Sequence, residues 1–124
     1  MNIVDSSGWL AYFADEHNAK NFVTPLSDSN SLVVPTVTIY EVFKVILRES
    51  SENDALQAIV AMQKGVVVDL TPSLAIAASK LSLEHNLPMV DSVILAIAKE
   101  FNAILWTQDS HLKNISHVKY FSKK

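Results

Sequence analysis

Short runs of β-branched and other apolar residues alternate with helix-length stretches along the whole chain, and this alternation limits the possible fold more than any other feature. The longer stretches have the 3.6-residue periodicity of helices with one apolar face. Helices between successive strands are typical of a parallel sheet, because parallel neighbours need a long connection. The predicted strands are residues 2–4, 32–34, 66–70, 103–107 and 117–121. We therefore expect an α/β fold with a mainly parallel central sheet of four to five strands flanked by helices.

Capping residues mark the ends of the predicted helices. Ser51 and Thr71 are favourable N-cap residues, and Pro72 suits the first turn of a helix. Asp91 follows the helix-breaking Pro88 and is expected to cap the last long helix. The helices predicted after the second strand are residues 36–48, 52–64, 72–85 and 92–101. The expected order of elements is βααβααβααβ with a final αβ.

The length of 124 residues and the hydrophobic content of 49% fit one domain, residues 1–124, with a sizeable core. Only Gly8 and Gly65 are glycines, so no stretch resembles an interdomain linker. A chain this small and apolar leaves part of its apolar surface exposed when it folds alone. We therefore expect a homodimer.

Composition excludes several functional classes. The longest apolar run is residues 93–98, far below the roughly 18–20 residues of a membrane-spanning helix, and the N-terminal residues contain no basic leader. We therefore expect a soluble, cytoplasmic protein. The lack of cysteine excludes disulfides and thiolate zinc sites, so any metal must bind oxygen or imidazole. The net charge of −3 gives no general electrostatic reason to expect nucleic acid.

Four acidic residues are predicted to converge on one edge of the sheet. Asp5 and Asp109 follow the first and fourth strands, and the carboxyl ends of parallel strands lie at the same edge. Asp91 begins a helix beside that edge, and Glu41 lies in the helix that leaves the second strand. Crowded carboxylates repel one another, which a divalent cation or raised pKa values would relieve. The pattern indicates either a site for a divalent cation or a group of carboxyls with raised pKa values.

Each acid also has an ordinary structural interpretation. Asp5 and Asp91 can serve as helix N-caps, and Asp109 can be a turn residue. Glu41 can lie on a solvated helix face. Asp69, at the end of the third predicted strand, competes for a place at the same edge, although it also suits a strand-to-helix turn.

Other common catalytic motifs are absent from the sequence. The four histidines have neither the i, i+4 spacing nor the His-Glu arrangement of zinc proteases. The sequence also lacks a glycine-rich phosphate loop and the Gly-x-Ser-x-Gly turn of serine hydrolases. A zinc site, a nucleotide-binding P-loop and a serine nucleophile are therefore not expected.

The four acids, taken with their neighbours, resemble the motifs of the PIN-domain ribonucleases, in particular the small VapC-type toxins of toxin–antitoxin pairs. The resemblance covers nearly the whole chain. Its segments are IVDSS at residues 3–7, TIYEV at residues 38–42, LPMVDSVILA at residues 87–96 and LWTQDSHL at residues 105–112. Four acids in the family's order, each in its expected context, form a specific pattern.

The resemblance implies a PIN-like three-layer fold and a metal-dependent endoribonuclease that hydrolyses RNA phosphodiester bonds. It implies a cognate antitoxin as partner and Mg²⁺ or Mn²⁺ as cofactor. The implied catalytic residues are Asp5, Glu41, Asp91 and Asp109, of which Asp5, Asp91 and Asp109 are the metal ligands. Hydrogen bonds or phosphate contacts would come from Ser6, Thr107, Lys44 and Arg48.

Two features differ from what the resemblance implies. The chain is acidic overall, and Arg48 is its only arginine, so a basic RNA-binding surface is small. Two alternatives are a receiver domain that accepts phosphate at a magnesium site and a non-catalytic interaction module. Receiver domains have adjacent acids after the first strand, where this chain has Asp5 followed by serines. Metal-dependent RNA cleavage would distinguish a ribonuclease from both.

Overall fold

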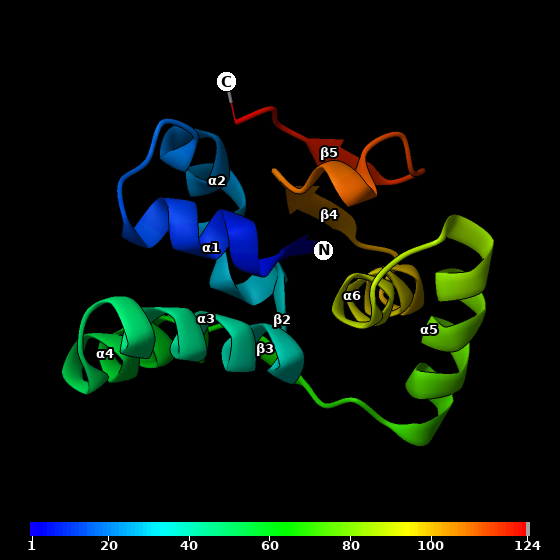
Figure 1. Cartoon of the computed structure of the whole chain (residues 1–124), viewed down its shortest axis with the longest axis horizontal. Coiled ribbons are helices and arrows are strands. Elements are labelled where there is room, and N and C mark those ends of the chain that lie inside the picture. Colours follow the sequence, from blue (N-terminus) through cyan, green and yellow to red (C-terminus); the bar gives the residue numbers. More distant parts are fainter. Residues whose placement is uncertain (124) are drawn as a thin grey trace.

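The computed structural model describes residues 1–123, so the last residue of the predicted domain, 124, lies outside the described part. Five strands form one sheet in the order β3-β2-β1-β4-β5, and all four neighbouring pairs are parallel (Figure 1). This confirms the predicted α/β fold. The strands are β1 (Asn2–Val4), β2 (Leu32–Pro35), β3 (Val66–Val68), β4 (Ile104–Thr107) and β5 (Val118–Tyr120).

Helices connect the strands in the predicted order. Ser51 accepts the backbone N–H of Asp54 as an N-cap, and Thr71 accepts that of Leu74, as expected. The final helical segment is only a short 3₁₀ turn. The helices are α1 (Ser6–Phe13), α2 (Ala19–Leu26), α3 (Thr36–Glu49), α4 (Glu52–Met62), α5 (Pro72–His85) and α6 (Met89–Glu100), with 3₁₀ turns η1 (Ser29–Ser31) and η2 (Ser110–Leu112).

The prediction that Asp91 caps the last long helix is wrong. Helix α6 begins at Met89 with Pro88 as its N-cap, and Asp91 lies inside the first turn. Pro88 has the extended backbone of a cap residue, with φ −59° and ψ 162°, so the helix begins immediately after it. The Ser92 hydroxyl donates to the carbonyl oxygens of Pro88 and Met89. Asp91 therefore has no capping role, and its carboxylate is available for the sheet edge.

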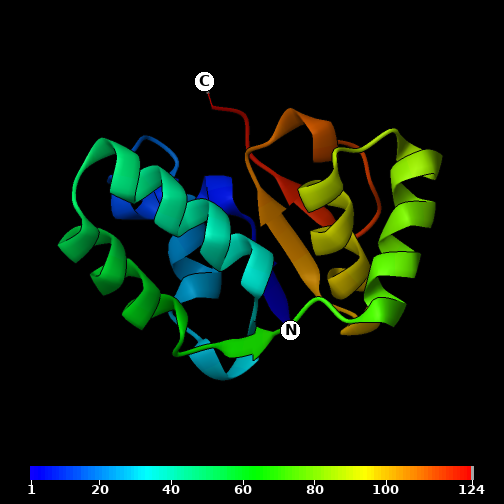
Figure 2. The ribbon, with the colours of Figure 1, turned by 60° about the horizontal axis from the view of Figure 1, so that its bottom comes forward.

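Helices cover both faces of the sheet and make three layers (Figure 2). Successive strand residues point to opposite faces. Ile3, Val33 and Leu105 pack against α5 and α6, whereas Val4 and Trp106 pack with residues of α1 to α4. The central strands β1, β2 and β4 bury both faces because nearly all their residues are apolar, which is typical of parallel sheets, whereas the edge strands β3 and β5 are more exposed.

The order of the strands places a crevice between β1 and β4. The chain proceeds from β1 outward to β2 and β3, then returns across the sheet to β4 and β5. Ligands of open α/β sheets bind at such a reversal, beyond the carboxyl ends of the strands. Helix α3 contacts α1 on one side and α6 on the other, so it borders this crevice. The acids after β1 and β4 are joined at this crevice through hydrogen bonds to Thr107.

Candidate metal centre at the sheet edge

Asp5 follows β1 directly and is buried, with 2% of its surface exposed. Its Oδ1 accepts the Ser7 hydroxyl at 2.7 Å and the backbone N–H of Gly8 at 3.1 Å. Its Oδ2 accepts the Thr107 hydroxyl at 2.5 Å. Asp5 is thus the N-cap of α1, as one interpretation of the sequence expected, and its carboxylate also faces β4. Burial raises the pKa of Asp5 to about 6, although the three hydrogen bonds oppose this effect.

The hydroxyl that orients Asp5 comes from Ser7, whereas the sequence pointed to Ser6. Ser6 is the first residue of α1 and is half-buried. The Ser7 oxygen also accepts the backbone N–H of Gln108 at 3.2 Å, so it joins the start of α1 to the end of β4. Gly8 permits this close packing, because a Cβ there would lie 2.5 Å from Val4 Cγ1. A role for Ser6 toward substrate stays a prediction.

Thr107, at the end of β4, connects Asp5 with Asp109. Its side chain is fully buried, and its oxygen accepts the backbone N–H of Asp109 at 2.8 Å while donating to Asp5. Asp109 in turn is the N-cap of η2, where its Oδ1 accepts the backbone N–H of His111 at 2.9 Å. The predicted turn at Asp109 is therefore present, and it directs the carboxylate toward the crevice.

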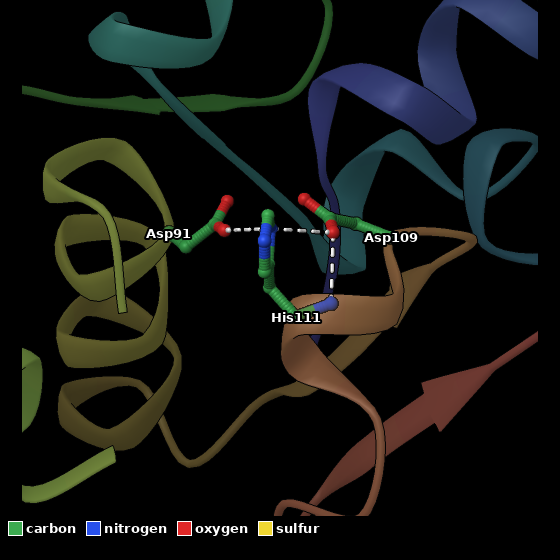
Figure 3. Close-up of side chains that lie close together, drawn as sticks. All are labelled: Asp91, Asp109 and His111. Carbon is green, nitrogen blue, oxygen red and sulfur yellow. Dashed lines mark hydrogen bonds and ion pairs between the residues drawn. The ribbon is translucent and has the colours of Figure 1, made fainter. Parts of the chain in front are cut away.

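Asp91, Asp109 and His111 lie side by side, with the imidazole between the two carboxylates (Figure 3). His111 Nδ1 is 3.1 Å from Asp109 Oδ1 and 3.7 Å from Asp91 Oδ2. One ligand atom from each of the three side chains lies within 4.8 Å of the others. The three residues come from α6, the turn after β4 and η2, so the tertiary fold assembles this group.

The pKa of Asp91 reflects the other three predicted acids as well as burial. Burial and the negative charges of Asp109, Asp5 and Glu41 together raise this pKa to about 7, although His111 acts in the opposite direction. Glu41 is half-buried on α3 at the border of the crevice. The structure therefore brings together the acids that the sequence selected.

Asp69 is the further acid that the sequence makes a candidate for the sheet edge of the four acids. It is exposed and follows β3, an edge strand separated from β1 by β2. With strands about 4.8 Å apart, this places it roughly two strand spacings from Asp5. Sheet order therefore separates Asp69 from the four acids.

The two predicted phosphate-binding side chains are exposed on α3. Lys44 Nζ lies 5.6 Å from the centre of the Tyr40 ring. Arg48 pairs with Glu49 at 3.3 Å near the end of the helix. Arg48 lies nearly two helical turns beyond Glu41, which corresponds to about 10 Å along the axis. Lys44 is thus the nearer of the two along the helix.

Two parts of the site were missed by the sequence reasoning. The spacing of His111 to the other histidines matches no zinc motif and therefore predicts no metal role, yet His111 lies two positions after Asp109 and faces Asp91. The second is a pair of buried amides, in which Asn18 Nδ2 donates to Gln108 Oε1 at 3.0 Å. The position of His111 beside Asp109 was a visible signal, whereas the partnership of Asn18 had none.

The donor set fits a hard divalent cation with one softer ligand. Carboxylate oxygens suit Mg²⁺ and Mn²⁺, and an imidazole nitrogen is accepted by Mn²⁺ and later transition metals. The raised pKa values of Asp5 and Asp91 reflect burial and mutual repulsion, both of which a bound cation would offset. The site is also accessible, since a hollow of about 460 Å³ beside it is lined by Ser7, Gln108, Asp109, Ser110, His111, Tyr120, Ser122 and Lys123.

The sequence model of the PIN domain matches residues 3–118. The chain belongs to the PIN domain family. This agrees with the resemblance seen in the four acidic segments, and the match is to PIN domains rather than to receiver domains. Among curated proteins, none matches the chain by sequence.

Solved structures with the same PIN fold are similar over nearly their full length. A toxin–antitoxin complex from Klebsiella pneumoniae aligns with a TM-score of 0.83 at 18% identity, over 98% of this chain and 99% of the other. Mycobacterium tuberculosis VapC20, a sarcin-ricin loop cleaving toxin, aligns with a TM-score of 0.73 at 17% identity, over 89% and 91%. The DNA-bound VapBC from Salmonella typhimurium aligns with a TM-score of 0.73 at 14% identity, over the whole of both chains. At these identities the similarity establishes the fold.

Proposed function

We propose that this PIN domain is a metal-dependent endoribonuclease that hydrolyses RNA phosphodiester bonds in the cytoplasm. The observation that supports this most strongly is the convergence of Asp5, Glu41, Asp91 and Asp109 at the reversal of the strand order, where their charges act on one another. A folded protein maintains such a costly group of acids where they bind a cation or a proton.

Asp5, Asp91 and Asp109 are the proposed metal ligands. A bound Mg²⁺ or Mn²⁺ supplies positive charge for the phosphate oxygens and lowers the pKa of a water. Ser7 and Thr107 hold the Asp5 carboxylate in one orientation through hydrogen bonds of 2.7 and 2.5 Å. Glu41 is half-buried on α3 and its charge acts on Asp91, so it would orient the attacking water.

Single-stranded or looped RNA would approach through the 460 Å³ hollow beside Asp109 and His111. Tyr120 and Lys123 line this hollow, so it combines an aromatic ring with a positive charge. The resident acids repel phosphate until a cation is bound. This explains how an acidic chain can accept RNA at this point.

We further propose that the protein is the toxin of a toxin–antitoxin pair, because a free ribonuclease would damage its own cell. The similar structures from Klebsiella pneumoniae and Salmonella typhimurium are such complexes. A groove of about 550 Å³ between α1, α3 and α4 is a suitable place for an amphipathic antitoxin helix. It combines apolar side chains such as Phe13 and Ile46 with the acids Glu16, Glu49 and Asp54, which favours a helix with basic residues.

The antitoxin would block catalysis by inserting an arginine or lysine among the four acids. A basic side chain there would form charge-assisted hydrogen bonds with the oxygens that bind the ion. Co-expression should produce a stable complex, and replacing the inserted basic residue should restore cleavage. An inhibitor that leaves Asp5, Glu41, Asp91 and Asp109 uncovered would contradict this mechanism.

The function is tested by incubating structured and single-stranded RNAs with the purified protein in Mg²⁺, Mn²⁺ or EDTA. We expect cleavage with either ion and none in EDTA. Asp5→Asn should lower the cleavage rate by about 100-fold or more, because it removes a metal ligand. Asp69→Asn is the matched control, since Asp69 is exposed and lies outside the cluster. Equal rates for the wild type and Asp5→Asn would reject the assignment.

A further inference from the structure

His111 lies where its imidazole can join the acids in binding an ion. Its Nδ1 is 3.1 Å from Asp109 Oδ1 and 3.7 Å from Asp91 Oδ2. Two atoms bound to one ion at about 2.0–2.2 Å can be separated by at most about 4.4 Å, so both distances are compatible with shared coordination. The imidazole nitrogen is therefore close enough to the Asp91 and Asp109 oxygens for all three atoms to bind one ion.

The backbone around His111 is held in place, although its side chain is 62% exposed. The His111 N–H donates to Asp109 Oδ1 at 2.9 Å, and the neighbouring Leu112 is fully buried in the core. The turn η2 is therefore anchored on both sides of the imidazole. An exposed histidine with a fixed backbone can bind a ligand without a large loss of conformational entropy.

We propose that His111 supplies a nitrogen ligand to the ion held by Asp91 and Asp109, and that it shifts the preference of this site from Mg²⁺ toward Mn²⁺. The proposal rests on the proposed function only in requiring that a divalent ion binds the acids. The proposal adds one ligand to those of the four acidic segments. It also gives a reason why the site would prefer one divalent ion over another.

The expected preference follows from ligand chemistry. Mg²⁺ favours carboxylate and water oxygens and retains several waters. Mn²⁺, as a first-row transition ion, binds an imidazole nitrogen more strongly than the purely hard Mg²⁺ does, although less strongly than the later ions of the row. Replacing one oxygen ligand by the His111 nitrogen therefore strengthens Mn²⁺ binding more than Mg²⁺ binding.

The proposal is tested on the full chain by titrating Mn²⁺ and, separately, Mg²⁺ into the wild type, His111→Ala and His85→Ala by calorimetry. His85 is the control, because it lies on α5 and pairs with Glu84. We expect His111→Ala to weaken Mn²⁺ binding about tenfold or more, a loss typical of groups that support a bound metal. Mg²⁺ affinity should change much less, and His85→Ala should leave both affinities unchanged.

Pulsed electron paramagnetic resonance of bound Mn²⁺ provides a readout that does not depend on RNA cleavage. A nitrogen coupling should appear in the wild type and His85→Ala and disappear in His111→Ala. If the wild type shows no nitrogen coupling, or if His111→Ala weakens both ions equally, His111 only pairs with the acids and the proposal is wrong. The proposed function would then still stand if Asp5→Asn abolishes cleavage. A wild type that binds neither ion would overturn both.

Discussion

The Thr107 hydroxyl donates to the Asp5 carboxylate across 2.5 Å, although 102 positions separate the two residues. The same oxygen accepts the backbone N–H of Asp109 at 2.8 Å. One buried hydroxyl therefore determines how the acid after β1 and the acid after β4 face each other. This contact is possible because β1 and β4 are neighbours in the sheet, with Val4 opposite Trp106.

Replacing Thr107 by valine should lower both stability and activity. The change keeps the shape of the side chain but removes the hydroxyl that pairs with Asp5 Oδ2 and with the Asp109 N–H, which costs about 1–3 kcal/mol of unfolding free energy. Urea unfolding and RNA cleavage would measure the two effects. Thr107→Ser keeps the hydroxyl and should retain cleavage. If Thr107→Val cleaves like the wild type, the hydroxyl does not position the acids.

The buried amide pair Asn18 and Gln108 should stabilise the turn that precedes Asp109. Asn18 Nδ2 also donates to the Ser122 carbonyl at 2.8 Å, and Gln108 Nε2 donates to the Ser7 carbonyl at 3.2 Å. We expect Asn18→Ala to lower the unfolding free energy by about 1–3 kcal/mol and to reduce cleavage. Asn21→Ala removes a single partly buried bond to Asn18 and should cost less than about 1.5 kcal/mol. Thermal unfolding of both variants would decide this.

Stability without metal should fall as pH rises, because the folded state raises the pKa values of Asp5 and Asp91 from 3.8 to about 6 and about 7. Well below pH 3.8 both carboxyls are protonated in the folded and unfolded states, so they do not lower the free energy of unfolding. Between pH 3.8 and 7 the folded state binds more protons, and stability decreases with pH. Urea unfolding in EDTA across this range should show the decrease.

Asp91→Asn should remove most of the loss of unfolding free energy that the ionised Asp91 carboxylate causes in the absence of metal. At pH 7.5 in EDTA we expect the variant to be more stable than the wild type by about 2 kcal/mol, after allowing for solvent screening of this partly exposed group. The gain should disappear near pH 4, where Asp91 is protonated in the wild type. A constant difference across pH would mean that the charge of Asp91 is not responsible.

The homodimer remains a prediction, and the structure suggests which face would form it. Ile76 and Leu83 lie seven positions apart on α5 with 61% and 89% of their surfaces exposed, so they share one helix face. We expect a dimer in light scattering, and Leu83→Asp should produce monomers. Val60→Asp is the control, because Val60 is 63% exposed on α4. A monomeric wild type at tens of micromolar would refute the prediction.

Lys44 should contribute to RNA affinity more than Arg48. Glu49 competes for the Arg48 guanidinium at 3.3 Å, whereas the Lys44 ammonium lies over the Tyr40 ring on the part of α3 nearer to Glu41. Lys44→Ala should reduce the slope of the logarithm of affinity against the logarithm of salt concentration by about 0.7, as expected for one phosphate contact with single-stranded RNA. The binding should be measured in an Asp5→Asn background, with Arg48→Ala for comparison.

Within the described residues, no helix has both the length and the apolar character needed to cross a bilayer, in agreement with the apolar runs of the sequence. The kinds of elements and their order were also predictable, because each depends on neighbours within a few positions. Ser51 and Thr71 cap helices through residues three positions away, and the short β-branched runs have high strand propensity. The local sequence likewise places Asp5 directly after β1 and Asp109 two positions after the end of β4.

Tertiary structure decided which of these local features meet. Sheet order depends on how helices cover both faces of the sheet, so it separates Asp69 from the cluster and puts β4 beside β1. The partnership of Thr107 with Asp5, the approach of His111 to Asp91 and the Asn18–Gln108 pair all follow from that order. Such contacts join residues of different elements, so no local periodicity or capping pattern predicts them. The sequence alone therefore determined the elements and the four acids, whereas packing across the sheet determined their partners.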